Sequence, residues 1–164
     1  VFALGRLMYG AWAGFWAGIG WLILPGVFFS TGVIATDAVM LPFWALSLLA
    51  MWRLTTTRAW FWALMLGVFV GVGVLAKYAM LYFVLCTALA AYWAPPVRDA
   101  LRSWRGATAG LIAAAIASPN VIWNFQNGFV TARHTASNAR FDLSDLFNAD
   151  ELFEFLGGQA LVLG

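Results

Sequence analysis

Hydrophobic residues make up 63% of the 164 residues of this chain and charged residues only 10%, and the mean hydropathy is +0.85. A soluble domain carries about 25% charged residues, so this composition excludes a soluble globular domain and predicts a membrane protein. The net charge is only +2, the sparse basic residues flank apolar runs, and the single cysteine, Cys86, has no partner for an internal disulfide, which leaves nucleic-acid binding and a disulfide framework without support.

Apolar segments of roughly the length of a membrane span recur along the chain. A transmembrane helix needs about 20 predominantly apolar residues, and several stretches come close to this length before polar residues interrupt them. The apolar run over residues 59–94 is too long for one helix, so we divide it at Lys77, its one charged residue. The expected spans cover residues 11–30, 38–53, 59–75, 78–93 and 105–123, and a sixth begins at about Leu152.

These segments predict an all-α, polytopic transmembrane helix bundle, because in lipid the backbone polar groups of a span must be satisfied within its own helix. We expect RLTTTR to form a tight polar loop and the proline-bounded APPVRDALRSWR to form a basic loop. Residues 120–151 are expected to form an extracytoplasmic loop within one transmembrane domain that covers residues 1–164. Because the chain begins at Val1 and ends in an apolar run, we expect it to be a piece of a longer protein.

The basic residues indicate the orientation of the spans. Cytoplasmic loops carry an excess of Lys and Arg, and with the expected spans one side of the membrane receives twice as many of them as the other. The richer side, which we take as cytoplasmic, receives Arg6, Arg53, Arg58, Arg98, Arg102 and Arg105, and the other side receives Lys77, Arg133 and Arg140. Asp37 and the acidic residues from Asp142 to Glu154 fall on this second, extracytoplasmic side.

Glycines at four-residue spacing indicate how the helices meet. Gly10, Gly14 and Gly18 share this spacing, as do Gly67 and Gly71. Small residues on one helix face allow two helix backbones to approach closely in a membrane. We therefore expect both sets to lie at helix–helix contacts within the bundle.

Asp37 is a candidate active-site carboxylate. It stands in VIATDAVMLPFW, at the extracytoplasmic start of the second expected span. A carboxylate there suits the positive end of the helix dipole and the free N–H groups of the first turn. An ionisable residue at the membrane also indicates function, and Asp37 can position an acceptor, bind a metal ion or hold a basic partner. The sequence leaves these roles open, and they are compatible with one another.

Lys77 and Tyr78 form a second candidate pair, in the hairpin GVGVLAKYAM. One interpretation is a lysine that extends its ammonium group to the membrane interface, with Tyr78 as an interfacial aromatic residue. The other is a phosphate ligand, since lysine binds phosphate as a compact point charge. A lysine with apolar surroundings at the membrane surface is suited to a phosphate whose lipid tail stays in the bilayer.

Amide and basic side chains follow the fifth expected span. Asn120, Asn124 and Gln126 alternate with aromatic residues in SPNVIWNFQNGF, a combination that favours sugar binding, although helix capping and membrane anchoring explain it equally well. Arg133 and His134 place cations on the extracytoplasmic side, which indicates an anionic partner. His134 has no other ligand type at metal-binding spacing, so we predict no metal site, while the use of a divalent metal ion stays open.

Four segments carry a resemblance to a known family: ALGRLMYGAWAGFWAG, TGVIATDAVMLPFWALSLLAMWRL, GVLAKYAMLYFVL and SPNVIWNFQNGFVTARH. In order and spacing they resemble bacterial glycosyltransferase family 39, the polyprenyl-phosphate-sugar-dependent transferases related to protein O-mannosyltransferases. The resemblance covers nearly the whole chain. It implies a multi-span enzyme of the C-type glycosyltransferase fold in the bacterial inner membrane.

The resemblance also implies roles for individual residues. Members of this family move a sugar from a polyprenyl phosphate to an acceptor at the outer face, with inversion at the anomeric carbon, and their general base lies in a first outer loop that would be upstream of Val1. Asp37 matches the family's second acidic position and Lys77 the basic residue near the carrier phosphate. Arg133 and His134 match the basic end of the loop motif.

Together these observations predict an integral-membrane glycosyltransferase with a polyprenyl-phosphate-sugar as donor substrate and a lipid, a polysaccharide or a protein as acceptor. The alternatives are a transporter or flippase of lipid-linked sugars, which would be expected to place charges near mid-bilayer, and a structural subunit without chemistry. The expected catalytic residue is Asp37, and the expected substrate-binding residues are Lys77, Tyr78, Asn124, Gln126, Arg133 and His134.

Overall fold

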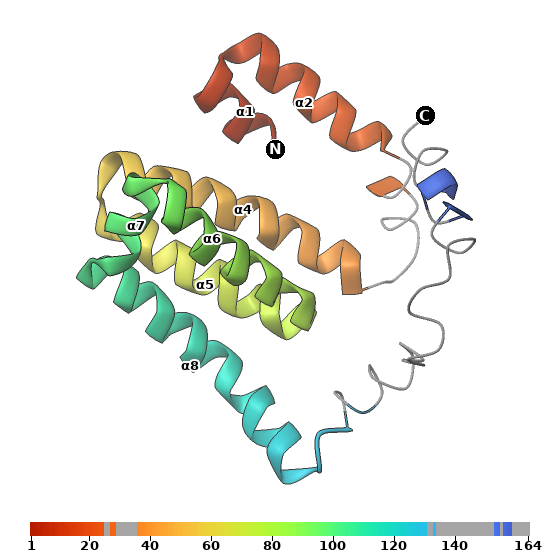
Figure 1. The fold of residues 1–164 in the computed structure, drawn as a ribbon, viewed down its shortest axis with the longest axis vertical. Helices are drawn as coiled ribbons and strands as arrows, with labels where there is room; N and C mark the ends of the chain where they lie inside the picture. The colour runs from red at the N-terminus through yellow and green to blue at the C-terminus, as the bar shows by residue number, and fades with distance from the viewer. Residues whose placement is uncertain (25–26, 29–35, 131–132, 134–152, 155, 159–164) are drawn as a thin grey trace.

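A computed structural model of the chain describes residues 1–24, 27–28, 36–130, 133, 153–154 and 156–158. Within these residues the chain is helical and contains no strand (Figure 1), which confirms the all-α class. The elements are α1 (Phe2–Tyr9), α2 (Ala11–Ile23), α4 (Thr36–Thr57), α5 (Trp60–Ala76), the 3₁₀ turn η1 (Tyr78–Met80), α6 (Leu81–Trp93), α7 (Pro95–Arg102) and α8 (Trp104–Gln126).

Helix α5 lies at the centre of the bundle, between α4 and α8 (Figure 1). Its buried residues include Ala63, Leu66 and Val70, which pack in one core with Leu54 of α4 and Met80 of η1. Helix α6 joins this core through Phe83, whose ring meets that of Trp44 of α4 edge to face at a centroid distance of 5.7 Å. The core therefore holds the ends of α4, α5 and α8 at fixed positions relative to one another.

Glycines let α5 and α8 approach closely, as their spacing predicts. A Cβ atom on Gly67 would lie 2.6 Å from the Ala109 carbonyl oxygen and 2.8 Å from Cβ of Ile112, and one on Gly71 would lie 2.8 Å from Cβ of Ile116. All three distances are shorter than van der Waals contact, so the two backbones approach each other where the glycines have no side chain. Because successive residues of α5 meet successive residues of α8, the two helices run in the same direction.

The glycine stripe expected in the first span is wrong at Gly10. Gly10 has φ +94°, a left-handed conformation that glycine adopts without strain, and it separates α1 from α2 instead of lying on a helix face. The two short helices fold back on each other at this break. A Cβ atom on Gly14 of α2 would lie 2.7 Å from the backbone nitrogen of Arg6 in α1, so this glycine does serve close packing, as expected.

The five expected spans are not confirmed by the helices that the structure describes. Among the described residues, α4 and α8 are long and apolar enough to cross a membrane, and η1–α6 with α7 qualifies as a third span only if the two are taken together across a bend of 118°. Helices α2 and α5, with 13 and 17 residues, are shorter. The apolar helices thus support a membrane protein, and the five-span arrangement is left as a prediction.

Two expected loops are largely helical. The RLTTTR segment continues α4 to Thr57, where the Thr57 hydroxyl donates to the carbonyl of Arg53 at 2.7 Å, so the connection to α5 shrinks to Arg58 and Ala59. The APPVRDALRSWR segment contains α7, because prolines in the first helical turn need no backbone donor. Polar composition and proline misled the prediction in both places.

Helix α8 also continues beyond the expected end of its span. Ser103 caps its start by accepting a hydrogen bond from the Gly106 N–H at 3.3 Å, and the helix includes Pro119 and ends at Gln126. The first residues of the expected extracytoplasmic loop, 120–126, are therefore helical. Most of the rest of that loop, residues 131–132 and 134–152, lies outside the described residues.

The close approach of α5 and α8 yields a test of the packing. We expect Gly67→Ala to lower the free energy of unfolding by about 1–3 kcal/mol, because the new methyl group must push the two helices apart. Gly110→Ala on α8 is the matched control, because a Cβ atom there meets nothing within 4 Å, and the gain in helix propensity is at most about 1 kcal/mol. Unfolding of the full-length protein in detergent measures both, and equal stability of the two variants would contradict the packing.

Candidate functional site

Asp37 and Lys77 form an ion pair across the α4–α5 hairpin. Asp37 lies in the first turn of α4, and Lys77 follows the last residue of α5 in an extended conformation. The Lys77 Nζ atom donates to Asp37 Oδ1 at 2.6 Å and to Oδ2 at 2.8 Å. The short connection between α4 and α5 makes the helices antiparallel, so the start of one lies beside the end of the other. This geometry explains why residues 40 positions apart meet.

The pair is neutral as a unit but open to solvent or ligand. The side chains of Lys77 and Asp37 keep 40% and 44% of their surface exposed. Both carboxylate oxygens accept a charge-assisted hydrogen bond, and the carboxylate also lies at the positive end of the α4 dipole. Of the roles that the sequence left open for Asp37, holding a basic partner is the one that the structure shows.

Tyr78, the next residue, is bonded to α8. Its hydroxyl donates to Oδ1 of Asn120 and accepts from Nδ2 of Asn124, at 2.9 Å for the second bond. Nδ2 of Asn124 also lies 3.1 Å from the Asn120 carbonyl oxygen and 3.2 Å from Asn120 Oδ1. Asn120 and Asn124 are one helical turn apart and share a face of α8. Asn124 is only 4% exposed, so its amide serves bonds inside the protein.

We call Asp37, Lys77, Tyr78, Asn120 and Asn124 the junction cluster, because all five meet where α5 passes into η1. Consecutive residues of this junction bond to opposite sides, Lys77 to α4 and Tyr78 to α8. The backbone that carries the lysine is thereby held from two helices. Asn120 was one of the amides noted in the sequence but was not among the expected substrate-binding residues, although its spacing of four residues from Asn124 would have placed the two amides together once the segment was known to be helical.

The remaining predicted site residues are not joined to the junction cluster in the part of the chain that the structure describes. Gln126, at the end of α8, and Arg133 are both exposed, and no side-chain hydrogen bond or ion pair there links them to the cluster. His134 lies outside the described residues. Within the described residues no three His, Cys, Asp or Glu side chains gather as a metal site would require.

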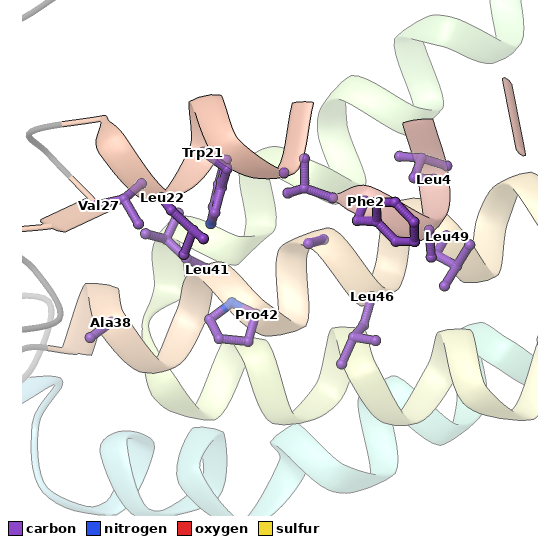
Figure 2. Close-up of a pocket in the computed structure, with 14 residues that line it drawn as sticks. Phe2, Leu4, Trp21, Leu22, Val27, Ala38, Leu41, Pro42, Leu46 and Leu49 are labelled. Atoms are coloured by element: carbon purple, nitrogen blue, oxygen red, sulfur yellow. The ribbon is translucent and has the colours of Figure 1, made fainter. Parts of the chain in front are cut away.

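An apolar pocket of about 570 Å³ lies between α4 and the α1–α2 hairpin (Figure 2), and neither Asp37 nor Lys77 lines it. Its α4 wall is one face of the helix, from Ala38 next to Asp37 to Leu49, a length of about 16 Å at 1.5 Å per residue. Figure 2 shows the opposite wall, which comes from the α1–α2 hairpin and includes Phe2, Leu4, Trp21 and Leu22. Such a lining suits a hydrocarbon chain better than a sugar.

Comparison with known proteins places these features in a family. The family model described as dolichyl-phosphate-mannose-protein mannosyltransferase matches residues 1–123, a region that contains Asp37, Lys77, Tyr78 and Asn120. The lipid A galacturonosyltransferase RgtD of Rhizobium johnstonii is 39% identical over 150 residues, which cover 91% of this chain and 31% of that protein. The chain thus spans about a third of the length of this curated relative.

No solved structure matches the chain, so the assignment depends on these two sequence matches. The family match covers about three quarters of the chain, and the relative covers nearly all of it. Both agree with the resemblance that the sequence motifs carry. The chain therefore belongs to the dolichyl-phosphate-mannose-protein mannosyltransferase family of membrane glycosyltransferases.

Proposed function

We propose that this chain is part of an enzyme that transfers a sugar from a polyprenyl-phosphate donor to an acceptor at the extracytoplasmic face of the bacterial inner membrane. The observation that carries the proposal is the half-exposed Asp37–Lys77 pair, together with an apolar pocket along α4 whose first lining residue on that helix is Ala38. A lipid-linked sugar phosphate needs a cation for its phosphate and an apolar surface for its chain. Family membership supports the same donor class.

Lys77 is suited to bind the donor phosphate without leaving Asp37. An ammonium group has three N–H donors, and the Asp37 carboxylate accepts two of them. The third is available to a phosphate oxygen. Asp37 then acts by fixing the position of the lysine, and the apolar pocket that begins at Ala38 accommodates the first part of the polyprenyl chain.

The reaction is a displacement at the anomeric carbon of the sugar. The acceptor oxygen forms the new glycosidic bond while the bond from the anomeric carbon to the phosphate oxygen breaks, and the phosphate leaves with the bonding electrons. Lys77 stabilises the negative charge that develops on this phosphate. The acceptor proton passes to a general base, which the family resemblance assigns to a loop upstream of Val1.

Lipid A is the acceptor that we propose to test first, with galacturonic acid as the sugar. The relative is named as a lipid A galacturonosyltransferase, and it matches nearly the whole chain. The family description names mannose and protein instead, so a protein or polysaccharide acceptor is the second choice. Gln126 and Arg133, which are exposed, and His134 are proposed to contact the sugar or its acceptor.

The first test is transfer of labelled sugar from a polyprenyl-phosphate donor to extracted lipid A, in membranes that contain the full-length protein. We expect Asp37→Asn and Lys77→Gln each to lower transfer by about 100-fold, because either change removes or misplaces the charge that stabilises the leaving phosphate. The controls are Asp99→Asn and Arg58→Gln, which remove the same charges from an exposed, 4.0 Å ion pair.

Full transfer by both junction variants would refute the assigned site. Loss of transfer in the Asp99 and Arg58 controls as well would show a general effect of charge on the protein. Movement of the donor across vesicles without cleavage of the sugar–phosphate bond would favour the transporter alternative over an enzyme.

A charge exchange separates the structural role of the ion pair from its chemical role. We expect Asp37→Lys and Lys77→Asp, made together, to recover most of the stability that each change alone removes, with a coupling energy of about 1 kcal/mol for such a half-exposed pair. Transfer should not recover, because the cation then lies on α4. Thermal unfolding and transfer are measured on the same preparations, and recovery of transfer would contradict the placement of the phosphate at Lys77.

Asn124 and Gln126 are expected to differ, although the sequence predicts the same role for both. Asn124→Leu should lower the free energy of unfolding by about 1–3 kcal/mol, because the Tyr78 hydroxyl loses its donor in a partly buried place. Gln126→Leu, at an exposed position, should leave stability unchanged and raise the KM for donor or acceptor. Thermal unfolding and steady-state kinetics of the two variants test this difference. A raised KM without loss of stability in Asn124→Leu would instead indicate that Asn124 binds the substrate directly.

A further inference from the structure

A second polar site lies where α6 turns into α7. The helix direction changes by 118° at this point, and Ala94 between the two helices has an extended conformation. A pocket of about 540 Å³ lies in the angle of the bend. Its lining residues come from the last turns of α6 and from one face of α7 and are Ala88, Ala91, Tyr92, Arg98, Leu101 and Arg102.

The two arginines of this pocket lie on one face of α7. Arg98 and Arg102 are four residues apart, so they are neighbours on the helix surface. Two other residues of α7, Ala100 and Leu101, pack against the protein core, and this contact fixes which side of the helix faces outward. The pocket therefore places two guanidinium groups beside apolar residues of α6.

Most other arginines at this end of the bundle already have partners within the protein. Arg53 lies over the ring of Trp62 at 5.7 Å and Arg105 over the ring of Trp60 at 5.2 Å, and Arg58 is 4.0 Å from Asp99. For Arg98 and Arg102 the described part of the chain shows no ion pair, side-chain hydrogen bond or ring contact. Arg98 and Arg102 are therefore available to a ligand, and a ligand that pairs with them must be anionic.

Exposed aromatic residues lie in the pocket lining or within two residues of it in the sequence. Tyr92, Trp93 and Trp104 keep 79%, 74% and 84% of their surface exposed, and such residues concentrate at the level of the lipid headgroups. Figure 1 shows α7 at the end of the bundle where α4 ends and α8 begins. The junction cluster lies at the opposite end of α6, about 20 Å away for its 13 residues at 1.5 Å each.

We propose that the pocket between α6 and α7 binds an anionic glycerophospholipid. Its phosphate lies between Arg98 and Arg102, which can each donate two parallel hydrogen bonds to phosphate oxygens. One acyl chain lies along the alanine face of α6. A zwitterionic lipid would leave the charges of the two arginines unneutralised, so a lipid with net negative charge is selected. This site does not depend on the transfer reaction proposed for the junction cluster.

The experiment measures lipid binding to the full-length protein in neutral detergent by native mass spectrometry. Phosphatidylglycerol is the probe, phosphatidylcholine tests headgroup charge, and inorganic phosphate in excess tests whether a free anion competes. We expect at least tenfold tighter binding of phosphatidylglycerol than of phosphatidylcholine, and little competition from phosphate. Combined Arg98→Gln and Arg102→Gln should weaken phosphatidylglycerol binding by about 30-fold, from the attraction of two arginines near a lipid surface.

Two further variants show whether a change in lipid affinity is specific to the two arginines of the pocket. Combined Arg6→Gln and Arg133→Gln removes the same total charge outside the pocket, keeps the Arg58–Asp99 pair of α7 intact, and should leave the affinity within about twofold of the parent protein. Combined Arg98→Lys and Arg102→Lys keeps the charge but loses the paired hydrogen bonds, so its affinity should be intermediate. Equal loss in the Arg6/Arg133 control, no preference for phosphatidylglycerol, or full displacement by inorganic phosphate would each overturn the proposal.

Discussion

The close contact between α5 and α8 determines where the residues of the junction cluster lie. Gly67 meets Ala109 and Ile112, and Gly71 meets the next turn of α8, so the two helices advance together in the same direction. Tyr78 follows Gly71 by seven residues, and two turns further along α8 it reaches Asn120 and Asn124. A side chain at either glycine would separate the helices, and the tyrosine would then lose its partners.

The connection between α4 and α5 supplies the other half of the junction. Only Arg58 and Ala59 separate the two helices, and Arg58 has φ +53°, a conformation that turns the chain sharply. The antiparallel hairpin that results places the first turn of α4 beside the end of α5, where Asp37 meets Lys77. Pairing lowers the free-energy cost of two charges at the membrane edge, yet both remain accessible to a ligand.

The sequence was sufficient for the class of fold and for part of the site. Composition predicts membrane helices, and the positions of Asp37 and Lys77 relative to the expected spans place both on one side. The amides of α8 could not be placed, because Pro119 and the polar residues after it resemble a helix end. The pairing of Asn120 with Tyr78 is a tertiary contact that no local pattern encodes.

Helix α7 was missed for a related reason. Its two prolines were interpreted as a break, whereas in a first helical turn they are tolerated. Gly10 shows the opposite error, since four-residue spacing suggested a continuous face where the chain reverses. In these cases the local residue types are compatible with two structures, and packing against the rest of the bundle decides between them.

The two ends of α6 differ in charge, because one end has the Asp37–Lys77 ion pair and the other has Arg98 and Arg102, and this difference bears on the two ligands that we propose. At the junction cluster Asp37 neutralises Lys77, so the site has little long-range attraction for abundant anionic lipids. A donor phosphate gains affinity there only together with its chain and its sugar. At the bend between α6 and α7 no acid of the described chain forms an ion pair with Arg98 or Arg102, since Asp99 of the same helix pairs with Arg58, and the lipid proposed there would be attracted by its headgroup. If both proposals hold, this arrangement keeps membrane phospholipid at one end of the bundle and leaves the other end to the lipid-linked donor.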